Sequence, residues 1–122
     1  AAAGIVPTAD SDMDGVDLRP LIADPAAQLD REALFFHYPH YYATTTPVCA
    51  VRSGDWKLLE YFEDQHIELY NLKDDLSEST DISLQHPEVV SRLRMQLHTW
   101  RDAVSAALPT SNPDYTTKVE SK

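Results

Sequence analysis

The 122-residue sequence has little basic charge, a single cysteine and no long apolar run. Lysine and arginine together number 10 against 20 acidic residues, which gives a net charge of −10. Binding to nucleic acid or to an anionic membrane surface needs clustered basic side chains, so the composition argues against both partners. An anionic small-molecule substrate stays possible, because a site can be locally basic on an acidic protein.

The single cysteine, Cys49, cannot form an internal disulfide, so cysteine use does not indicate a redox compartment. It lies in VCAVRS among apolar neighbours, which indicates an inert core cysteine. The alternative is a nucleophilic thiolate with His37 or His40 as its basic partner, but the spacing does not require that contact.

Two targeting signals are also missing from the sequence. No apolar run approaches the roughly 20 residues that a membrane helix needs, and no basic segment precedes an apolar stretch as in a signal peptide. The chain begins AAAGIVPTAD without a methionine, which we interpret as a cut inside a longer protein. The missing leader therefore says little about location.

Residues 1–30 are rich in proline and aspartate, with prolines at positions 7, 20 and 25. Prolines at this density interrupt regular structure, so we expect an irregular connector. The aspartates Asp10, Asp12 and Asp14, followed by glycine, match the first half of an EF-hand calcium loop. The twelfth position is Leu21 instead of a bidentate glutamate, which favours a solvated acidic turn over a calcium site.

Four short segments between residues 31 and 72 have the patterns of β-strands: REALFFHY, PVCAVRSG, DWKLLEYF and HIELYNL. The first stops at Pro39, which cannot donate to a strand ladder. In the third, Trp56 and Leu58 alternate with Lys57 and Leu59, so both faces are partly apolar. This is typical of a central strand covered on both sides. The short polar connections predict antiparallel pairing of neighbours.

The period changes after an acidic loop at residues 73–86. Apolar residues then recur at spacings of three and four: Val90, Leu93, Leu97, Trp100 and Val104. This spacing predicts the inward face of an amphipathic helix that begins near Pro87 and ends at Leu108. Three arginines fall mostly off this stripe: Arg92, Arg94 and Arg101.

The expected fold class is therefore α+β, with a small antiparallel sheet of about four strands packed against one long C-terminal helix. We expect an irregular N-terminal connector at residues 1–30, a compact subdomain at residues 31–115 and a tail at residues 116–122.

Five segments together carry a family pattern: DGVDLRPLI, REALFFHYPHY, AVRSGDWKLLEYFED, IELYNLKDDLSESTDI and LHTWRDAVSAALPTSNPDY. They resemble the C-terminal region of type I sulfatases, the arylsulfatase-like branch of the alkaline-phosphatase superfamily. The resemblance runs from about Ala3 to Tyr115, and RSGDWKL followed by ELYNL and an acidic loop is its most specific part. Family members usually carry D-P-x-E in that loop, whereas here Leu76 and Ser77 separate Asp75 from Glu78.

The resemblance implies that the catalytic groups lie elsewhere. In the family, a formylglycine is made from the cysteine of a C-x-P-S-R motif, and a divalent cation, usually calcium, binds beside it through Asp and Asn side chains. Both belong to a large N-terminal α/β domain. Cys49 is followed by AVRS, which has no proline at the motif's position. We therefore expect an N-terminal catalytic domain of the same protein to carry the nucleophile and the calcium, and this chain alone to be inactive.

Two histidines are the candidate substrate-binding residues, His37 and His40 in LFFHYPHYY. The strand ends at Pro39, and a loop beyond it is where functional residues concentrate. Histidine can donate a hydrogen bond to a sugar hydroxyl, or to a sulfate when it is protonated. In the alternative reading both histidines are structural, and the aromatic residues around them pack at the seam with the catalytic domain. Arg52 and Lys57 are weaker candidates for sulfate contacts, because strand residues of this kind usually offset an acidic loop.

Two functions remain open at the level of sequence. In the first, the chain completes the pocket of a sulfatase that hydrolyses sulfate esters of a carbohydrate or an aryl alcohol. In the second, it is a stand-alone domain whose aromatic segment docks another protein. The resemblance also implies a periplasmic or secreted protein.

Overall fold

A computed structural model describes residues 15–114 of the chain, which divides into two compact units at Glu32 and Ala33. The described part of the first unit contains one short helix, α1 (Arg19–Ala23), and is otherwise irregular. The calcium-like aspartates at positions 10, 12 and 14 and the tail at residues 116–122 lie outside the described residues.

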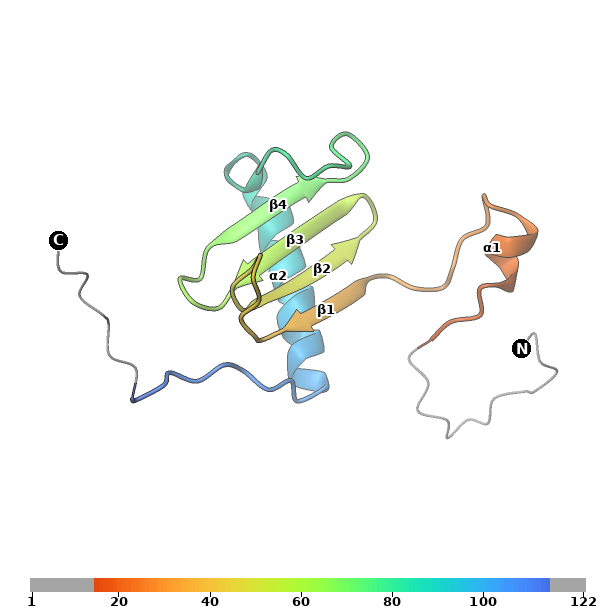
Figure 1. Cartoon of the computed structure of the whole chain (residues 1–122). Helices are drawn as coiled ribbons and strands as arrows, with labels where there is room; N and C mark the ends of the chain where they lie inside the picture. Colours follow the sequence, from red (N-terminus) through yellow and green to blue (C-terminus); the bar gives the residue numbers. More distant parts are fainter. Residues whose placement is uncertain (1–14, 115–122) are drawn as a thin grey trace. The chain divides into compact units, whose positions relative to one another are not determined.

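The second unit contains a four-stranded antiparallel sheet with the order β1-β2-β3-β4 (Figure 1). The strands are β1 (Leu34–Tyr38), β2 (Val48–Ser53), β3 (Trp56–Tyr61) and β4 (Ile67–Asn71). Gly54, with φ of 59°, makes the tight turn between β2 and β3, where a left-handed backbone suits glycine. The predicted α+β fold and the central place of the third strand are confirmed.

One long helix, α2 (Pro87–Ala103), crosses one face of this sheet, and a short 3-10 helix, η1 (Ser83–Gln85), precedes it. The strands place alternate side chains toward α2, which builds a single core. Its fully buried members are Cys49, Val51, Leu58, Leu69, Leu93 and Leu97. Trp100 packs against this core, as its spacing in the sequence predicts.

The helix ends at Ala103, earlier than the predicted Leu108. Ser105 has φ of 50°, and the backbone N–H groups of Ser105 and Ala106 donate to the carbonyls of Asp102 and Arg101. This paired closure is a Schellman ending, which reverses the chain direction. The prediction that Val104 lies on the buried stripe is therefore wrong, and its side chain is 52% exposed.

The opposite face of the sheet carries large apolar side chains that are exposed. Leu34, Phe36 and Tyr38 of β1 alternate with the core-facing residues and are 36%, 56% and 42% exposed. Within the described part of this unit, α2 covers the other face only. The sequence predicted cover on both sides of β3, and the second cover is not among these residues.

No helix within residues 15–114 is long and apolar enough to cross a membrane.

Candidate functional site

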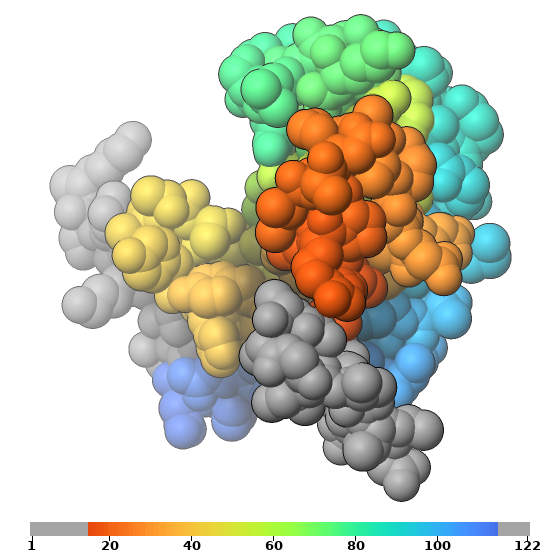
Figure 2. All heavy atoms as spheres, turned by 90° about the vertical axis from the view of Figure 1, so that its right-hand side faces the viewer, coloured from red at the N-terminus to blue at the C-terminus, as the bar shows by residue number. Residues whose placement is uncertain are grey.

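The loop after β1, residues 39–47, stands out from the sheet. In Figure 2 this loop (yellow) projects on one side of the sheet and α2 (cyan to blue) lies on the other. Reciprocal backbone hydrogen bonds between Tyr42 and Thr45, at 3.0 and 3.3 Å, close a tight turn within it. Tyr41 and Tyr42 are 70% and 68% exposed, so the loop offers two aromatic side chains to a ligand or a partner.

His37 lies within β1, on the face of the sheet that α2 covers. Its Nε2 is 2.7 Å from the carbonyl oxygen of Ala107, which can only accept, so Nε2 carries the hydrogen. The ring meets Phe62 edge to face, with centroids 5.7 Å apart. Its Nδ1 is buried without a hydrogen-bond partner among the described residues. His37 thus ties the segment after the helix to the edge of the sheet.

His40 lies beyond Pro39 on the exposed loop, where its ring meets Tyr38 edge to face at 5.6 Å. The structure places the two histidines in different surroundings. Their contact with substrate stays a prediction, and His40 is the more exposed of the two.

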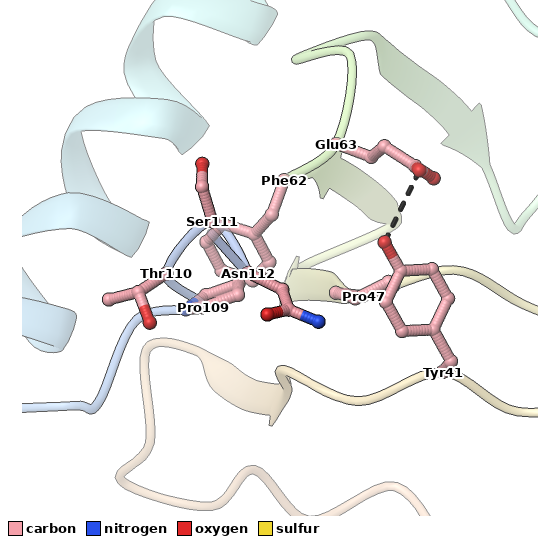
Figure 3. Close-up of a pocket in the computed structure, with 8 residues that line it drawn as sticks. All are labelled: Tyr41, Pro47, Phe62, Glu63, Pro109, Thr110, Ser111 and Asn112. Atoms are coloured by element: carbon pink, nitrogen blue, oxygen red, sulfur yellow. Dashed lines mark hydrogen bonds between the residues drawn. The ribbon is translucent and has the colours of Figure 1, made fainter. Parts of the chain in front are cut away.

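A surface pocket of about 570 Å³ opens beside this loop. Three segments meet there: the loop after β1, the residues just after β3 and the stretch that follows α2. Its lining residues are Tyr41, Pro47, Phe62, Glu63, Pro109, Thr110, Ser111 and Asn112. Figure 3 shows Tyr41 and Glu63 on one side of the pocket and Pro109 and Thr110 on the other. The hydroxyl of Tyr41 donates to the carboxylate of Glu63 at 3.2 Å, which holds the two side chains together.

A second polar cluster lies between β3 and α2, around the buried carboxylate of Glu60. His98 Nε2 is 2.8 Å from Glu60 Oε2, Arg94 Nε is 3.4 Å from the same oxygen, and Arg101 Nη1 is 3.9 Å from Oε1. Burial alone would raise the pKa of Glu60, but the hydrogen bonds and charges of His98 and Arg94 hold that pKa below its ordinary value. The cluster therefore keeps an ionised carboxylate under the helix.

Arg101 is the exception among the three arginines that were predicted to fall mostly off the apolar stripe. Its side chain is only 14% exposed, and its guanidinium lies 5.7 Å from the centroid of the Phe62 ring. The long arginine stem packs on apolar surface while its charged end approaches Glu60, a common arrangement for this side chain.

The model of the family described as "N-sulphoglucosamine sulphohydrolase, C-terminal" matches residues 2–103 of this sequence. This chain belongs to that family. The match covers most of the chain, including all four strands and the whole of α2. The resemblance to the C-terminal region of sulfatases, inferred from the quoted segments, is confirmed.

Two known proteins are similar to this chain over most of its length. A protein named sulfatase from Formosa agariphila is 28% identical over 101 residues, which cover 73% of this chain and 18% of the relative. A solved chain, from the structure of BT4656 in complex with its substrate D-glucosamine-2-N,6-O-disulfate, is 24% identical with a TM-score of 0.62. That likeness covers 85% of this chain and 22% of the solved one, and it shows the fold. The chain thus spans about a fifth of the length of these relatives.

Cys49 sits in the core of this sulfatase-family subdomain with no exposed surface. Burial raises the pKa of its thiol, although the charge of Arg101 opposes that effect. A thiol that stays protonated is a poor nucleophile, and the expectation of a buried core cysteine is confirmed. Within residues 15–114 no group of three His, Cys, Asp or Glu side chains is arranged to hold a metal ion.

Lys57, a weaker candidate for a sulfate contact, is paired with the acidic loop of the sulfatase-family pattern. Its Nζ donates to both carboxylate oxygens of Glu78, at 2.6 and 2.7 Å. The expectation that Lys57 offsets the acidic loop is confirmed. Asp75 organises the same loop by accepting from the backbone of Ser79 and Thr80, and these bonds lower its pKa. Arg52 is exposed.

Proposed function

We propose that this chain is the C-terminal subdomain of a sulfatase that hydrolyses sulfate esters of carbohydrates. The observation that carries the proposal is the family match over residues 2–103, by a family defined as the C-terminal part of a sulphohydrolase. The relatives are about five times longer than the matched region, which leaves room for a separate catalytic domain. Formylglycine and calcium on that domain would supply the nucleophile and hold the sulfate group.

A sulfated glucosamine is the substrate class that the comparisons favour over an aryl sulfate. The family description names sulphoglucosamine, and the solved relative is bound to a disulfated D-glucosamine. A sugar presents hydroxyl and amide groups that loop residues can bind. In this proposal His40 borders the substrate site of the catalytic domain and forms a hydrogen bond with the sugar, while the chemistry takes place on that domain.

The open face of the sheet is the surface that we assign to the catalytic domain. Leu34, Phe36 and Tyr38 form an apolar strip there, and exposed aromatic strips of this kind mark protein interfaces. Burial and the nearby Glu68 raise the pKa of Tyr61 on the same face to about 12, so its hydroxyl stays protonated and donates to Glu68 at 3.0 Å. The face therefore combines apolar area with satisfied polar groups. Like its family, the protein is expected in the periplasm or outside the cell.

The test uses the full-length parent enzyme and sulfate release from D-glucosamine 6-sulfate. Phe36→Asp on the open face should lower both the melting temperature and the rate of sulfate release, because a charge at a packed interface remains unpaired. Met95→Asp is the matched control, since Met95 on α2 is 66% exposed and Phe36 is 56% exposed. The control should change neither quantity by much.

Two results would refute the proposal. If the full-length parent releases no sulfate from sulfated sugars, the proposal that it is a carbohydrate sulfatase is refuted. A parent whose activity and stability are unchanged by Phe36→Asp would remove the assigned interface and return the aromatic face to the alternative, a surface for a separate partner protein.

A further inference from the structure

We propose that the pocket beside Tyr41 binds a sulfate-free sugar unit of the glycan on which the enzyme acts. The proposal rests on the proposed function, because it takes a sulfated carbohydrate as the substrate. The described residues that line this pocket all belong to this chain. The pocket's volume of about 570 Å³ falls within the range typical of small-molecule pockets, about 300–1,000 Å³.

The apolar part of the lining suits the C–H face of a sugar ring. Tyr41 and Phe62 contribute aromatic rings, and Pro47 and Pro109 add two compact apolar surfaces. Tyrosine presents an apolar body with a polar tip, which matches a ligand that is itself apolar on one face and polar at its edge. An aliphatic ligand would leave the remaining polar groups of the pocket without partners.

The polar part of the lining suits hydroxyl groups at the edge of the ring. Glu63 Oε1 accepts a hydrogen bond from the Tyr41 hydroxyl. A carboxylate has further lone pairs that accept hydrogen bonds from sugar hydroxyls. Thr110, Ser111 and Asn112 add side chains that can both donate and accept. Side chains that can form hydrogen bonds with a ligand thus lie on both sides of the aromatic surface.

The charge of the lining disfavours a sulfate group. None of the eight lining residues is lysine, arginine or histidine, and Glu63 is acidic. A sulfate ester in the pocket would lose water without gaining a cationic partner, and it would be repelled by Glu63. The hydrogen bond from the Tyr41 hydroxyl also holds the Glu63 side chain in place before any ligand binds, which lowers the entropy cost of binding. The pocket therefore favours an unsulfated ring.

The first test is a nuclear magnetic resonance titration of the ¹⁵N-labelled 122-residue chain with N-acetyl-D-glucosamine, N-acetyl-D-glucosamine 6-sulfate and inorganic sulfate. The neutral sugar should shift the amide signals of Tyr41, Phe62, Glu63 and Asn112. The sulfated sugar should bind about fivefold more weakly, and inorganic sulfate should shift none of them. Tighter binding of the sulfated sugar, or no shifts with the neutral sugar at tens of millimolar, would overturn the proposal.

Two pairs of variants locate the binding. Tyr41→Ala should abolish the shifts, whereas Tyr42→Ala, which removes an equally exposed tyrosine next to it that is not part of the lining, should keep them. Glu63→Gln should remove most of the preference for the neutral sugar, whereas Asp64→Asn should retain it. Equal behaviour within either pair would overturn the assignment to this pocket.

A kinetic test in the full-length parent separates this proposal from the proposed function. Tyr41→Ala should lower kcat/KM on a sulfated oligosaccharide about tenfold and leave D-glucosamine 6-sulfate hydrolysis within about twofold, because only the longer substrate reaches the pocket. Equal losses on both substrates would contradict the pocket proposal. If the parent cleaves neither substrate while the chain still binds the neutral sugar, the proposed function fails and the binding site stands.

Discussion

The indole ring of Trp100 lies parallel to the phenyl ring of Phe35, with centroids 4.9 Å apart and an angle of 4° between the planes. This stack joins the last turns of α2 to β1, the strand at the edge of the sheet. Stacked aromatic pairs contribute free energy beyond the area that they bury. The stack therefore fixes the end of the helix on the edge strand.

Trp100→Ala should lower the free energy of unfolding by about 3 kcal/mol, the loss typical of a large aromatic removed from a core. A double-mutant cycle with Phe35→Leu should give a coupling of about 0.5–1.5 kcal/mol between the two rings. Urea unfolding followed by circular dichroism measures both values. Met95→Ala, at an exposed helix position, serves as the control with a change under about 0.5 kcal/mol. A Trp100→Ala variant as stable as the parent would contradict the inward orientation of this helix face.

Glu60→Gln should lower the free energy of unfolding by about 1–3 kcal/mol near pH 7, because the carboxylate loses its charged hydrogen bonds to His98 and Arg94. The pKa of Glu60 in the folded chain lies below its ordinary value of 4.5. Its stabilising contribution is therefore complete above that value and is lost as the pH falls through the folded pKa.

The stability gap between the parent chain and Glu60→Gln should accordingly narrow below about pH 4.5. Thermal melts between pH 3 and pH 7 measure it. Glu63→Gln, which changes an exposed carboxylate three residues later, is the comparison and should show a small gap at every pH. A gap for Glu60→Gln that widens toward low pH would contradict the lowered pKa.

Ser105→Gly should raise the free energy of unfolding by about 0.5–1 kcal/mol. Ser105 has φ of 50°, a left-handed conformation that costs an ordinary residue energy and that glycine adopts without strain. Ala103→Gly, at the last helical residue, is the matched control and should lower stability by about 0.5 kcal/mol. Chemical denaturation compares the two, and a loss of stability in both would mean that the helix does not end at this residue.

His40→Ala in the full-length parent should lower kcat/KM on a sulfated glycan by about two- to tenfold, as expected for one lost hydrogen bond. Hydrolysis of a small aryl sulfate should change much less, because that substrate does not reach the loop. His37→Ala should instead lower the melting temperature, since it removes the bond to the Ala107 carbonyl. Equal losses on both substrates at unchanged stability would indicate a catalytic role for His40, and no loss on either would make it structural.

The strands and the helix could be predicted because each has a regular period in the sequence. In the third strand Trp56 and Leu58 recur at a period of two. Leu93 and Leu97 in the helix repeat at the spacing of one helical turn. The end of the helix could not be predicted in this way. Val104 continues the apolar spacing, but the chain turns at Ser105, a residue whose type gives no signal for a left-handed backbone.

The pocket and the buried ion cluster depend on contacts that no spacing encodes. The pocket joins Tyr41, Glu63 and Asn112, which come from three separate segments. Glu60 offered a partial signal, because the alternation of β3 places it on the core face between Leu58 and Phe62. An acid at such a position needs a cation opposite, and the arginines of the predicted helix were available to provide one.

Each strand of the sheet pairs with the strand that follows it in the chain, and the helix then returns across all of them. The strand pairs of the sheet therefore join segments that are close in sequence, and each of these pairing steps closes only a short loop. The entropy cost of such closures is small, and sheets with this order form faster than sheets whose strands cross over. We expect residues 33–103 to fold in roughly milliseconds, one hairpin after another, before the helix closes over the core.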